Sequence, residues 1–365
     1  MISCLRQGAP PIAPQKGTLS PFTPYAPSEK YVKYLEDVYI LSPWGIILDK
    51  NFEPIWDTAN EIIYWCGRPQ QFPDLVQKYG LSGLGEFKTR ESVFSRAKFV
   101  IEDLVVKARA KGDITELDAS FDYIYGCHPF DQMVFGHLYD TLQRFHPLDG
   151  LPSKKSKLII SSPQHITDFS RHLEILGFNY ETIIRKKELS LLKVPSLLVG
   201  EMACFPAGLN IPTHDWFFEK YVLNNSRIVT QPEQDLKLYL DRSSVGRAKK
   251  RNIIRAEEVG QFLSSKGFVT HEAFQVLDDV INAYYNASTI IGAHGAAFSN
   301  IMFCGPSTKI YELMPHNRYV PAFAKLPKKT LDYWLIKMEG DSDFNIDPSV
   351  EFISELVSGQ WEKRF

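Results

Sequence analysis

Apolar and polar segments alternate along the second half of the chain in a way that predicts strands followed by helices. Residues 157–162, KLIISS, form a short apolar run, and 165–178, HITDFSRHLEILGF, is amphipathic and closes at Gly177. This pattern is typical of a strand, a helix and a glycine cap. The rhythm recurs at 237–242, 256–268, 274–286, 288–293 and 309–314. We therefore expect the α/β class, with a mainly parallel sheet in this half.

The first half shows a weaker pattern, and together the two halves suggest several domains. Residues 38–49 are rich in β-branched and aromatic residues, which predicts strands broken by Pro43 and Gly45, and 91–111 has helical spacing. A chain of 365 residues suits two domains of about 100 to 200 residues each. The expected parts are a proline-rich extended arm (1–28), an N-terminal domain (29–152), a C-terminal domain (153–340) and a tail with a short helix (341–365).

Charge, cysteine content and the lack of long apolar runs limit the binding partners and the cellular location that the sequence predicts. The formal net charge of -2 argues against a protein that neutralises nucleic acid phosphates wholesale. The five cysteines lie far apart without a CxxC pair, which is typical of reduced cysteines in the cytoplasm. The first residues lack the apolar stretch of a signal peptide, and no run approaches about 18 apolar residues. We therefore expect a cytoplasmic protein with at most peripheral membrane contact.

The segment 287–303, ASTIIGAHGAAFSNIMF, joins an apolar strand to a turn of small residues and a helix. Gly292, Gly295 and Ala296 let a ligand approach the backbone, and the start of a helix binds anions, so a diphosphate is expected here. His294 within the turn can donate to a phosphate or an acceptor oxygen. The alternative is an ordinary tight connection with a structural histidine.

A basic segment follows the strand at 237–242. Ligands of open α/β sheets bind at the carboxyl ends of the strands, so Arg242 stands where a ligand is expected. Arginine binds phosphate oxygens in a bidentate manner, and Lys250 and Arg251 add positive charge. Glu312 ends the strand at 309–314 and is a candidate for accepting two ribose hydroxyls. The alternative for the basic segment is a solvated helix face.

In the first half, MVFGHLYDTLQRFHPL places His137 and Asp140 three residues apart, on one face of a helix. Such a pair can supply the base that a transferase needs near its acceptor hydroxyl. The alternative is an ordinary helix with a packed histidine and a capping aspartate.

These segments, in this order, resemble the family 61 glycosyltransferases, and the likeness spans roughly residues 38–335. The residues that carry it are FGHLYDTL at 135–142, YLDR ending at Arg242, Lys250 and Arg251, GF followed by Glu272, GAHGAAFSN from Gly292 to Asn300, and YELMP at 311–315. Family members often place the acid four residues after the motif histidine, whereas Asp140 follows His137 by three.

The resemblance implies an inverting glycosyltransferase of the GT-B type, with two Rossmann-like domains facing each other across a cleft. The donor, a nucleotide sugar expected to be a UDP-sugar, would bind the second domain, and a glycan or lipid-linked glycan acceptor would bind the first. No cofactor and no metal are expected. The one DxD sequence, Asp341-Ser342-Asp343, lies in a polar tail and is interpreted as a loop. Polysaccharide biosynthesis in the cytoplasm is the setting that the resemblance suggests.

Two other classes compete with this interpretation. A non-catalytic module that binds a nucleotide or a glycan is the alternative if the base near His137 has been lost, and binding without turnover would reveal it. A Rossmann-type oxidoreductase is disfavoured because no GxGxxG follows a strand with an acidic residue about 20 positions later.

Overall fold

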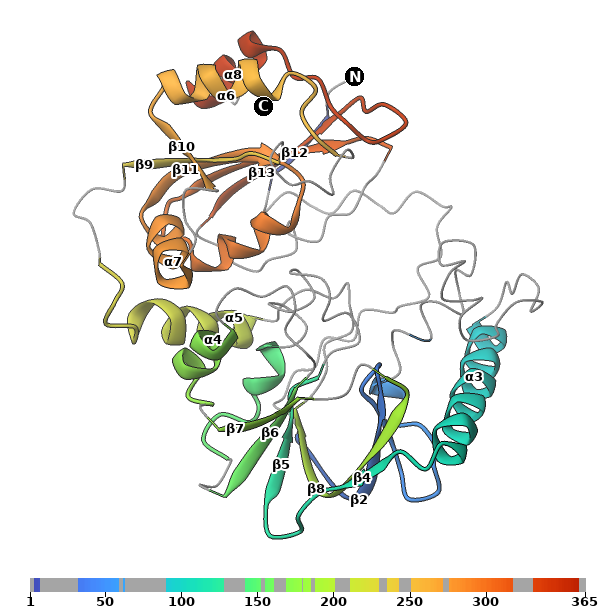
Figure 1. Cartoon of the computed structure of the whole chain (residues 1–365). Coiled ribbons are helices and arrows are strands. Elements are labelled where there is room, and N and C mark those ends of the chain that lie inside the picture. Colours follow the sequence, from blue (N-terminus) through green and yellow to red (C-terminus); the bar gives the residue numbers. More distant parts are fainter. Residues whose placement is uncertain are drawn as a thin grey trace. The chain divides into compact units, whose positions relative to one another are not determined.

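The computed structural model describes residues 3–6, 32–58, 62, 90–127, 142–151, 155–160, 169–178, 180–184, 188–200, 211–229, 235–242, 251–271, 276–317 and 331–360. The chain divides into two compact units. The N-terminal unit comprises Leu19–Phe169 and Gly177–Ala207, and the C-terminal unit comprises Met1–Thr18, Ser170–Leu176 and Gly208–Phe365. Each unit contains a sheet of its own (Figure 1).

The N-terminal unit is built on a mixed sheet, whose described strands run in the order β3-β2-β8-β5-β6-β7, with β4 also paired to β8. The long strands β2 and β8 are antiparallel, whereas β5, β6 and β7 are parallel. The bounds are β2 (Val32–Ser42), β3 (Ile46–Leu48), β4 (Ile114–Glu116), β5 (Asp122–Tyr125), β6 (Ser156–Ile160), β7 (Glu181–Ile184) and β8 (Ser190–Gly200).

One long helix, α3 (Arg90–Ala110), packs against the sheet of this unit. Its buried residues Ala97, Ile101, Leu104 and Ala108 recur every three or four positions and pack in one core cluster with Trp44. The strands predicted at 38–49 and the helix predicted at 91–111 are thereby confirmed. Two short 3₁₀ helices, η1 (Trp56–Thr58) and η4 (Leu142–Phe145), complete the described elements of the unit.

The C-terminal unit is built on a mainly parallel sheet, as its sequence pattern predicts. Its described strands run in the order β1-β13-β12-β11-β9-β10, and all neighbours are parallel except β1, which pairs antiparallel with β13 at the edge. The bounds are β1 (Ser3–Arg6), β9 (Leu236–Leu240), β10 (Phe268–Thr270), β11 (Ala287–Ala293), β12 (Lys309–Pro315) and β13 (Asp332–Met338). Part of the predicted extended arm therefore forms an edge strand.

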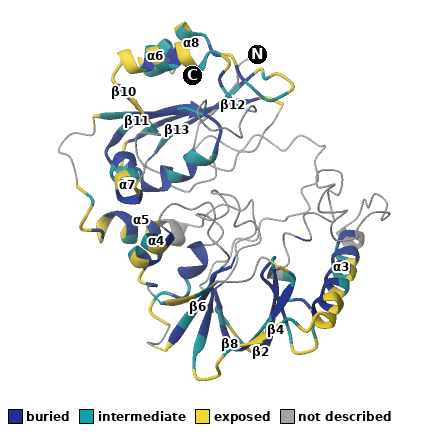
Figure 2. Ribbon diagram, in the orientation of Figure 1, coloured by how far each residue is buried: buried dark blue, intermediate teal, exposed yellow. Residues whose placement is uncertain are grey.

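Helices cover both faces of this sheet (Figure 1). On one face lie α6 (Ala256–Ser265) and the predicted terminal helix α8 (Val350–Val357), and on the other lies α7 (Leu277–Tyr285), which packs against the 3₁₀ helix η7 (Ala296–Phe303). The unit also holds α5 (Ile211–Phe218) and the π-helix η5 (Glu219–Leu223). The central strands are mostly buried, while α6 and α8 expose their outer sides (Figure 2).

The strand and helix predicted at 157–178 exist, but they do not open the second sheet as expected. β6 pairs with β5 and β7 in the N-terminal unit, and the helix that follows, α4 (Phe169–Leu176), belongs mostly to the C-terminal unit. Gly177 caps this helix with a φ of +82°, which explains its glycine. The local pattern of apolar residues predicts that this strand forms. It does not predict which sheet the strand joins, because an apolar strand can pair with many different parallel neighbours.

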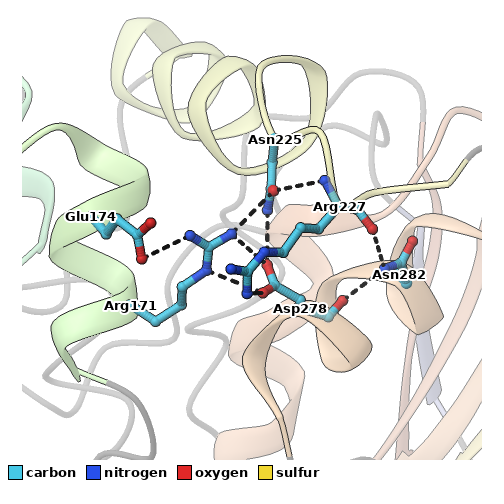
Figure 3. A network of polar contacts seen from close by, with 6 residues as sticks. All are labelled: Arg171, Glu174, Asn225, Arg227, Asp278 and Asn282. Carbon is cyan, nitrogen blue, oxygen red and sulfur yellow. Dashed lines mark hydrogen bonds and ion pairs between the residues drawn. The ribbon is translucent and has the colours of Figure 1, made fainter.

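A polar network holds α4 against α7 within the C-terminal unit (Figure 3). Arg171 grips the buried carboxylate of Asp278 with two hydrogen bonds, Nε to Oδ2 and Nη2 to Oδ1, each 3.1 Å long. Asn225 and Arg227 each donate a further hydrogen bond of 3.0 Å to the same carboxylate. Burial alone raises the pKa of Asp278, but these donors outweigh it, so the pKa lies below its ordinary value.

A second contact of α4 is apolar in its surroundings. The Nδ1 atom of His172 lies 2.7 Å from the hydroxyl of Tyr221 on η5, and both side chains are buried. Burial lowers the pKa of His172 from 6.5 to about 3, because the protonated ring would lose its hydration. Burial also raises the pKa of Tyr221. The pair is therefore neutral across the physiological range.

Within the described residues, no helix is long and apolar enough to span a bilayer. The same residues contain no group of three or more His, Cys, Asp or Glu side chains arranged to hold a metal ion.

Candidate functional site

The strand order of the parallel sheet points to one edge. The chain runs from β9 to its neighbour β10, then returns to the other side of β9 with β11 and continues outward through β12 and β13. The direction of winding therefore reverses between β9 and β11. In open parallel sheets, ligands bind outside the carboxyl ends of the strands at this reversal. β9 ends at Leu240 and β11 ends at Ala293, so the site is expected just beyond these two residues.

The register brings the predicted site residues to this edge. Leu240, Gly292 and Glu312 are paired in one row across β9, β11 and β12. Side chains two positions apart in a strand project from the same face, so Arg242 and His294 lie one step beyond this row on its face. Arg242 also contacts the turn after β11, because a Cβ built on Gly295 would lie 1.7 Å from Arg242 Nη1 and 2.8 Å from its Cζ. The guanidinium therefore lies directly against the glycine backbone.

The two glycines of the turn are needed for different reasons. A Cβ on Gly292 would lie 2.6 Å from the Cβ of Leu240 and 2.7 Å from its carbonyl oxygen, so the close pairing of β11 with β9 excludes a side chain. Gly295 has extended backbone, with φ −177° and ψ 176°, which any residue adopts. The glycine there makes room for the arginine and does not serve a special backbone conformation.

The predicted helix after the turn is a 3₁₀ helix, η7, which Gly295 precedes as its N-cap. Ala296 and Asn300 are half-buried in it. The N–H of Phe298 donates to the Gly295 carbonyl at 3.1 Å, and the Ala297 carbonyl accepts from the Tyr284 hydroxyl at 3.0 Å. Tyr284 on α7 thus fixes the first turn, and the N–H groups of Ala296 and Ala297 lie before the first bond of the helix.

His294 and Glu312 form a buried pair, which the sequence did not predict. Nδ1 of His294 is hydrogen-bonded to Oε1 of Glu312, and the His294 N–H donates to the Leu313 carbonyl at 2.8 Å. Glu312 is fully buried, and its Oε2 accepts a hydrogen bond from the Tyr333 hydroxyl. Both carboxylate oxygens thus already have protein partners, which does not favour the predicted contact with ribose hydroxyls. Tyr333 belongs to no motif, so only the register of β13 with β12 reveals it.

Arg251 is held by its backbone against the loop that contains the DxD sequence. Its φ is +66°, which is uncommon for a residue other than glycine, and its N–H donates to the Asp343 carbonyl at 3.1 Å. The carboxylate of Asp341 accepts backbone N–H groups of Asp343 and Asn345 at 2.8 Å each. These bonds, with Asn345 the largest contributor, lower the pKa of Asp341. The predicted loop is therefore a turn closed by its own aspartate.

Three of the predicted site residues, His137, Asp140 and Lys250, lie outside the described residues. Of the others, the structure gathers Arg242, Gly292, His294, Gly295, Ala296 and Glu312 at the carboxyl edge of the sheet, with Asn300 one turn into η7.

The comparisons with known proteins concern the same part of the chain. The model of the family described as Glycosyltransferase 61 matches residues 126–311, about half of the 365 residues, and this range includes β9, β11 and η7 and ends within β12. No curated protein matches the chain significantly.

Proposed function

We propose that this chain, which belongs to the glycosyltransferase 61 family and is therefore a glycosyltransferase, transfers a sugar from a nucleotide donor. The proposed transfer inverts the anomeric carbon and needs no metal ion. The proposed donor is a UDP-sugar, and the acceptor is a hydroxyl of a glycan or lipid-linked glycan. The proposed architecture is the GT-B type. A cytoplasmic location and a role in polysaccharide biosynthesis remain predictions.

The observation that best supports the donor site is the contact of the Arg242 guanidinium with the backbone of Gly295, at the edge where the direction of winding of the sheet reverses. A guanidinium binds two phosphate oxygens at once, and N–H groups at the start of a helix favour negative charge. A nucleoside diphosphate gains negative charge as it leaves, so donors fixed in advance at this edge stabilise the transition state more than the bound donor. Lys250 and Arg251 are proposed to add to this stabilisation, and His294 is proposed to contact the nucleotide sugar.

The chemistry is a single displacement. The acceptor oxygen forms its bond to the anomeric carbon on one face while the bond to the diphosphate oxygen breaks on the other, which inverts that carbon. The hydroxyl proton passes to a base, for which the motif offers His137 or Asp140. The nucleoside diphosphate leaves with the electron pair of the broken bond, opposite Arg242.

Calorimetric titration of the EDTA-treated protein with nucleoside diphosphates tests the donor site, with Arg242→Ala as the main variant. Binding of one nucleoside diphosphate is expected in the parent protein, and turnover of its sugar should fall about a hundredfold in the variant, as when one preorganised donor is lost. Arg255→Ala is the matched control, because Arg255 is engaged with Asp347 at 2.7 Å and follows the same basic segment. Equal losses in both variants would contradict the assignment.

The stereochemistry needs its own measurement. Proton NMR of the first product formed from an α-linked nucleotide sugar is expected to show a β-linked sugar, because one displacement inverts the anomeric carbon. Activity that persists after EDTA treatment supports metal independence, and restoration only by added Mg²⁺ or Mn²⁺ would refute it. A product with the donor's own anomeric configuration would exclude the single displacement.

A further inference from the structure

Glu312 is a buried residue of β12, the strand between β11 and β13, and its two carboxylate oxygens contact two polar side chains. Oε1 is bonded to Nδ1 of His294 and Oε2 accepts from the hydroxyl of Tyr333. Glu312 is 0% exposed, and His294 is 6% exposed. A buried carboxylate is tolerated only when hydrogen bonds compensate its lost hydration, and these two contacts supply that compensation.

The register explains why these side chains meet. Glu312 pairs with Gly292 on β11, and His294 follows Gly292 by two positions on the same face. Tyr333 pairs with Ile310 on β12, two positions before Glu312 and again on that face. The absence of a side chain at Gly292 leaves the diagonal between His294 and Glu312 open. The contact is therefore set by the pairing of three strands and by the first residue of the turn that follows β11.

An ionised carboxylate only accepts hydrogen bonds, so both of its partners must donate. Tyr333 donates from its hydroxyl, and His294 must then carry a proton on Nδ1. In the neutral ring this leaves the lone pair on Nε2, so the carboxylate selects one of two tautomers. Second partners of this kind orient a histidine as well as set its tautomer.

We propose that Glu312 and Tyr333 are positioning residues, which hold His294 as the Nδ1-protonated tautomer, so that the ring meets the nucleotide sugar through the Nε2 lone pair, which accepts a hydrogen bond from a hydroxyl of that substrate. This inference rests on the proposed function for what His294 acts upon. It replaces the ribose contact first expected for Glu312 and assigns a role to Tyr333, which the sequence did not single out.

The tautomer is tested without any substrate. Long-range proton–nitrogen NMR of protein labelled with ¹⁵N-histidine distinguishes a protonated Nδ1 from a protonated Nε2. The signal of His294 is identified as the one that is lost in His294→Gln. We expect protonated Nδ1 in the parent protein at a pH where the ring is neutral. Protonated Nε2 in the parent protein would overturn the proposal, since Glu312 would then be the donor.

Variants of the carboxylate and its second partner extend the test. Glu312→Gln offers one acceptor oxygen and one amide donor, so it cannot accept from both neighbours, and the preference for protonated Nδ1 should be lost. Tyr311→Phe is the matched control, because Tyr311 is equally buried on β12 but faces the α6 and α8 side. Its spectrum should keep the parent tautomer. An unchanged tautomer in Glu312→Gln would refute the role of Glu312.

Kinetics separates positioning from simple support of the fold. Tyr333→Phe, the milder variant, and Glu312→Gln should lower kcat about 10- to 100-fold, by analogy with the outer partners of metal-bound histidines, while KM for the donor changes little. Unchanged kcat in both variants would overturn the positioning role yet leave a donor site at Arg242 intact. Failure of the parent protein to bind any nucleotide would instead overturn the proposed function, and the NMR result on the tautomer would stand.

Discussion

Replacing Gly295 with alanine should move Arg242 without disturbing the fold. The new Cβ would lie 1.7 Å from Arg242 Nη1, which no real contact permits, so one of the two groups must shift. The atom in the way is the far end of a flexible side chain, and the extended backbone of Gly295 accepts alanine without strain. The arginine is therefore displaced from its seat, whereas the strands and η7 keep their places.

The structure sets the size of both effects. Hydrogen bonds to a charged partner contribute about 1.5–3 kcal/mol, so loss of the Arg242 contact should weaken nucleoside diphosphate binding about 10- to 150-fold. The free energy of unfolding should change by less than about 1 kcal/mol. Gly292→Ala is the opposite case, since its Cβ meets the backbone oxygen of Leu240 at 2.7 Å. Two paired strands must separate there, which costs about 1–3 kcal/mol of stability.

Calorimetry measures nucleoside diphosphate binding, and thermal unfolding measures Tm. Both are applied to Gly295→Ala, Gly292→Ala, Arg242→Ala and the double variant of Gly295→Ala with Arg242→Ala. If alanine at Gly295 acts by displacing the arginine, the double variant should bind no more weakly than Arg242→Ala alone, because the two changes remove one interaction. A further loss in the double variant would refute the reasoning, since the methyl group would then obstruct the ligand itself. A fall in Tm as large as that of Gly292→Ala would refute it equally.

Two predictions concern stability in the C-terminal unit. The pKa of His172 is about 3 in the folded chain and 6.5 ordinarily, so only the unfolded chain binds this proton between those values. The free energy of unfolding should therefore fall as the pH is lowered from about 6.5, by up to about 5 kcal/mol. His172→Phe should flatten this slope in urea unfolding at several pH values, and an unchanged slope would contradict the prediction. Arg171 and Arg227 bind the same Asp278 carboxylate, but their side chains are 16% and 61% exposed. Arg171→Ala should therefore lower the free energy of unfolding by about 3 kcal/mol and speed hydrogen exchange in α4, whereas Arg227→Ala should lower it by less than about 1 kcal/mol. Equal losses in the two variants would contradict the argument.

Local pattern predicts the elements of this protein well and their neighbours poorly. The helix near 91–111 and the strands β9, β11 and β12 follow from apolar spacing that each segment carries by itself, whereas β10 and β13 of the same sheet were not predicted. β6 shows the limit, because its apolar residues specify a buried strand but not the sheet that buries it. The packing of α4 against α7 includes the bond between Arg171 and Asp278, which are 107 positions apart and form no local pattern.

The candidate site shows the same division. Arg242 was expected at a ligand because it follows a strand, and the turn at His294 because its residues are small. That Arg242 lies against Gly295 follows only from the parallel pairing of β9 with β11, which no spacing between them reveals. Tyr333 could not be found at all from the sequence, since its partner Glu312 is reached through the register of a neighbouring strand.

Placing the site on paired strands has a consequence for how its residues work together. Leu240, Gly292 and Glu312 form a continuous row of strand pairs, and Arg242 and His294 are the next residues outward on that face. A shift of one position in β11 would turn His294 to the opposite face and remove it from both Glu312 and the ligand edge. The buried row therefore fixes Arg242 and His294 relative to one another before any ligand arrives, and an arginine fixed in advance is the preorganisation that stabilising a leaving diphosphate requires.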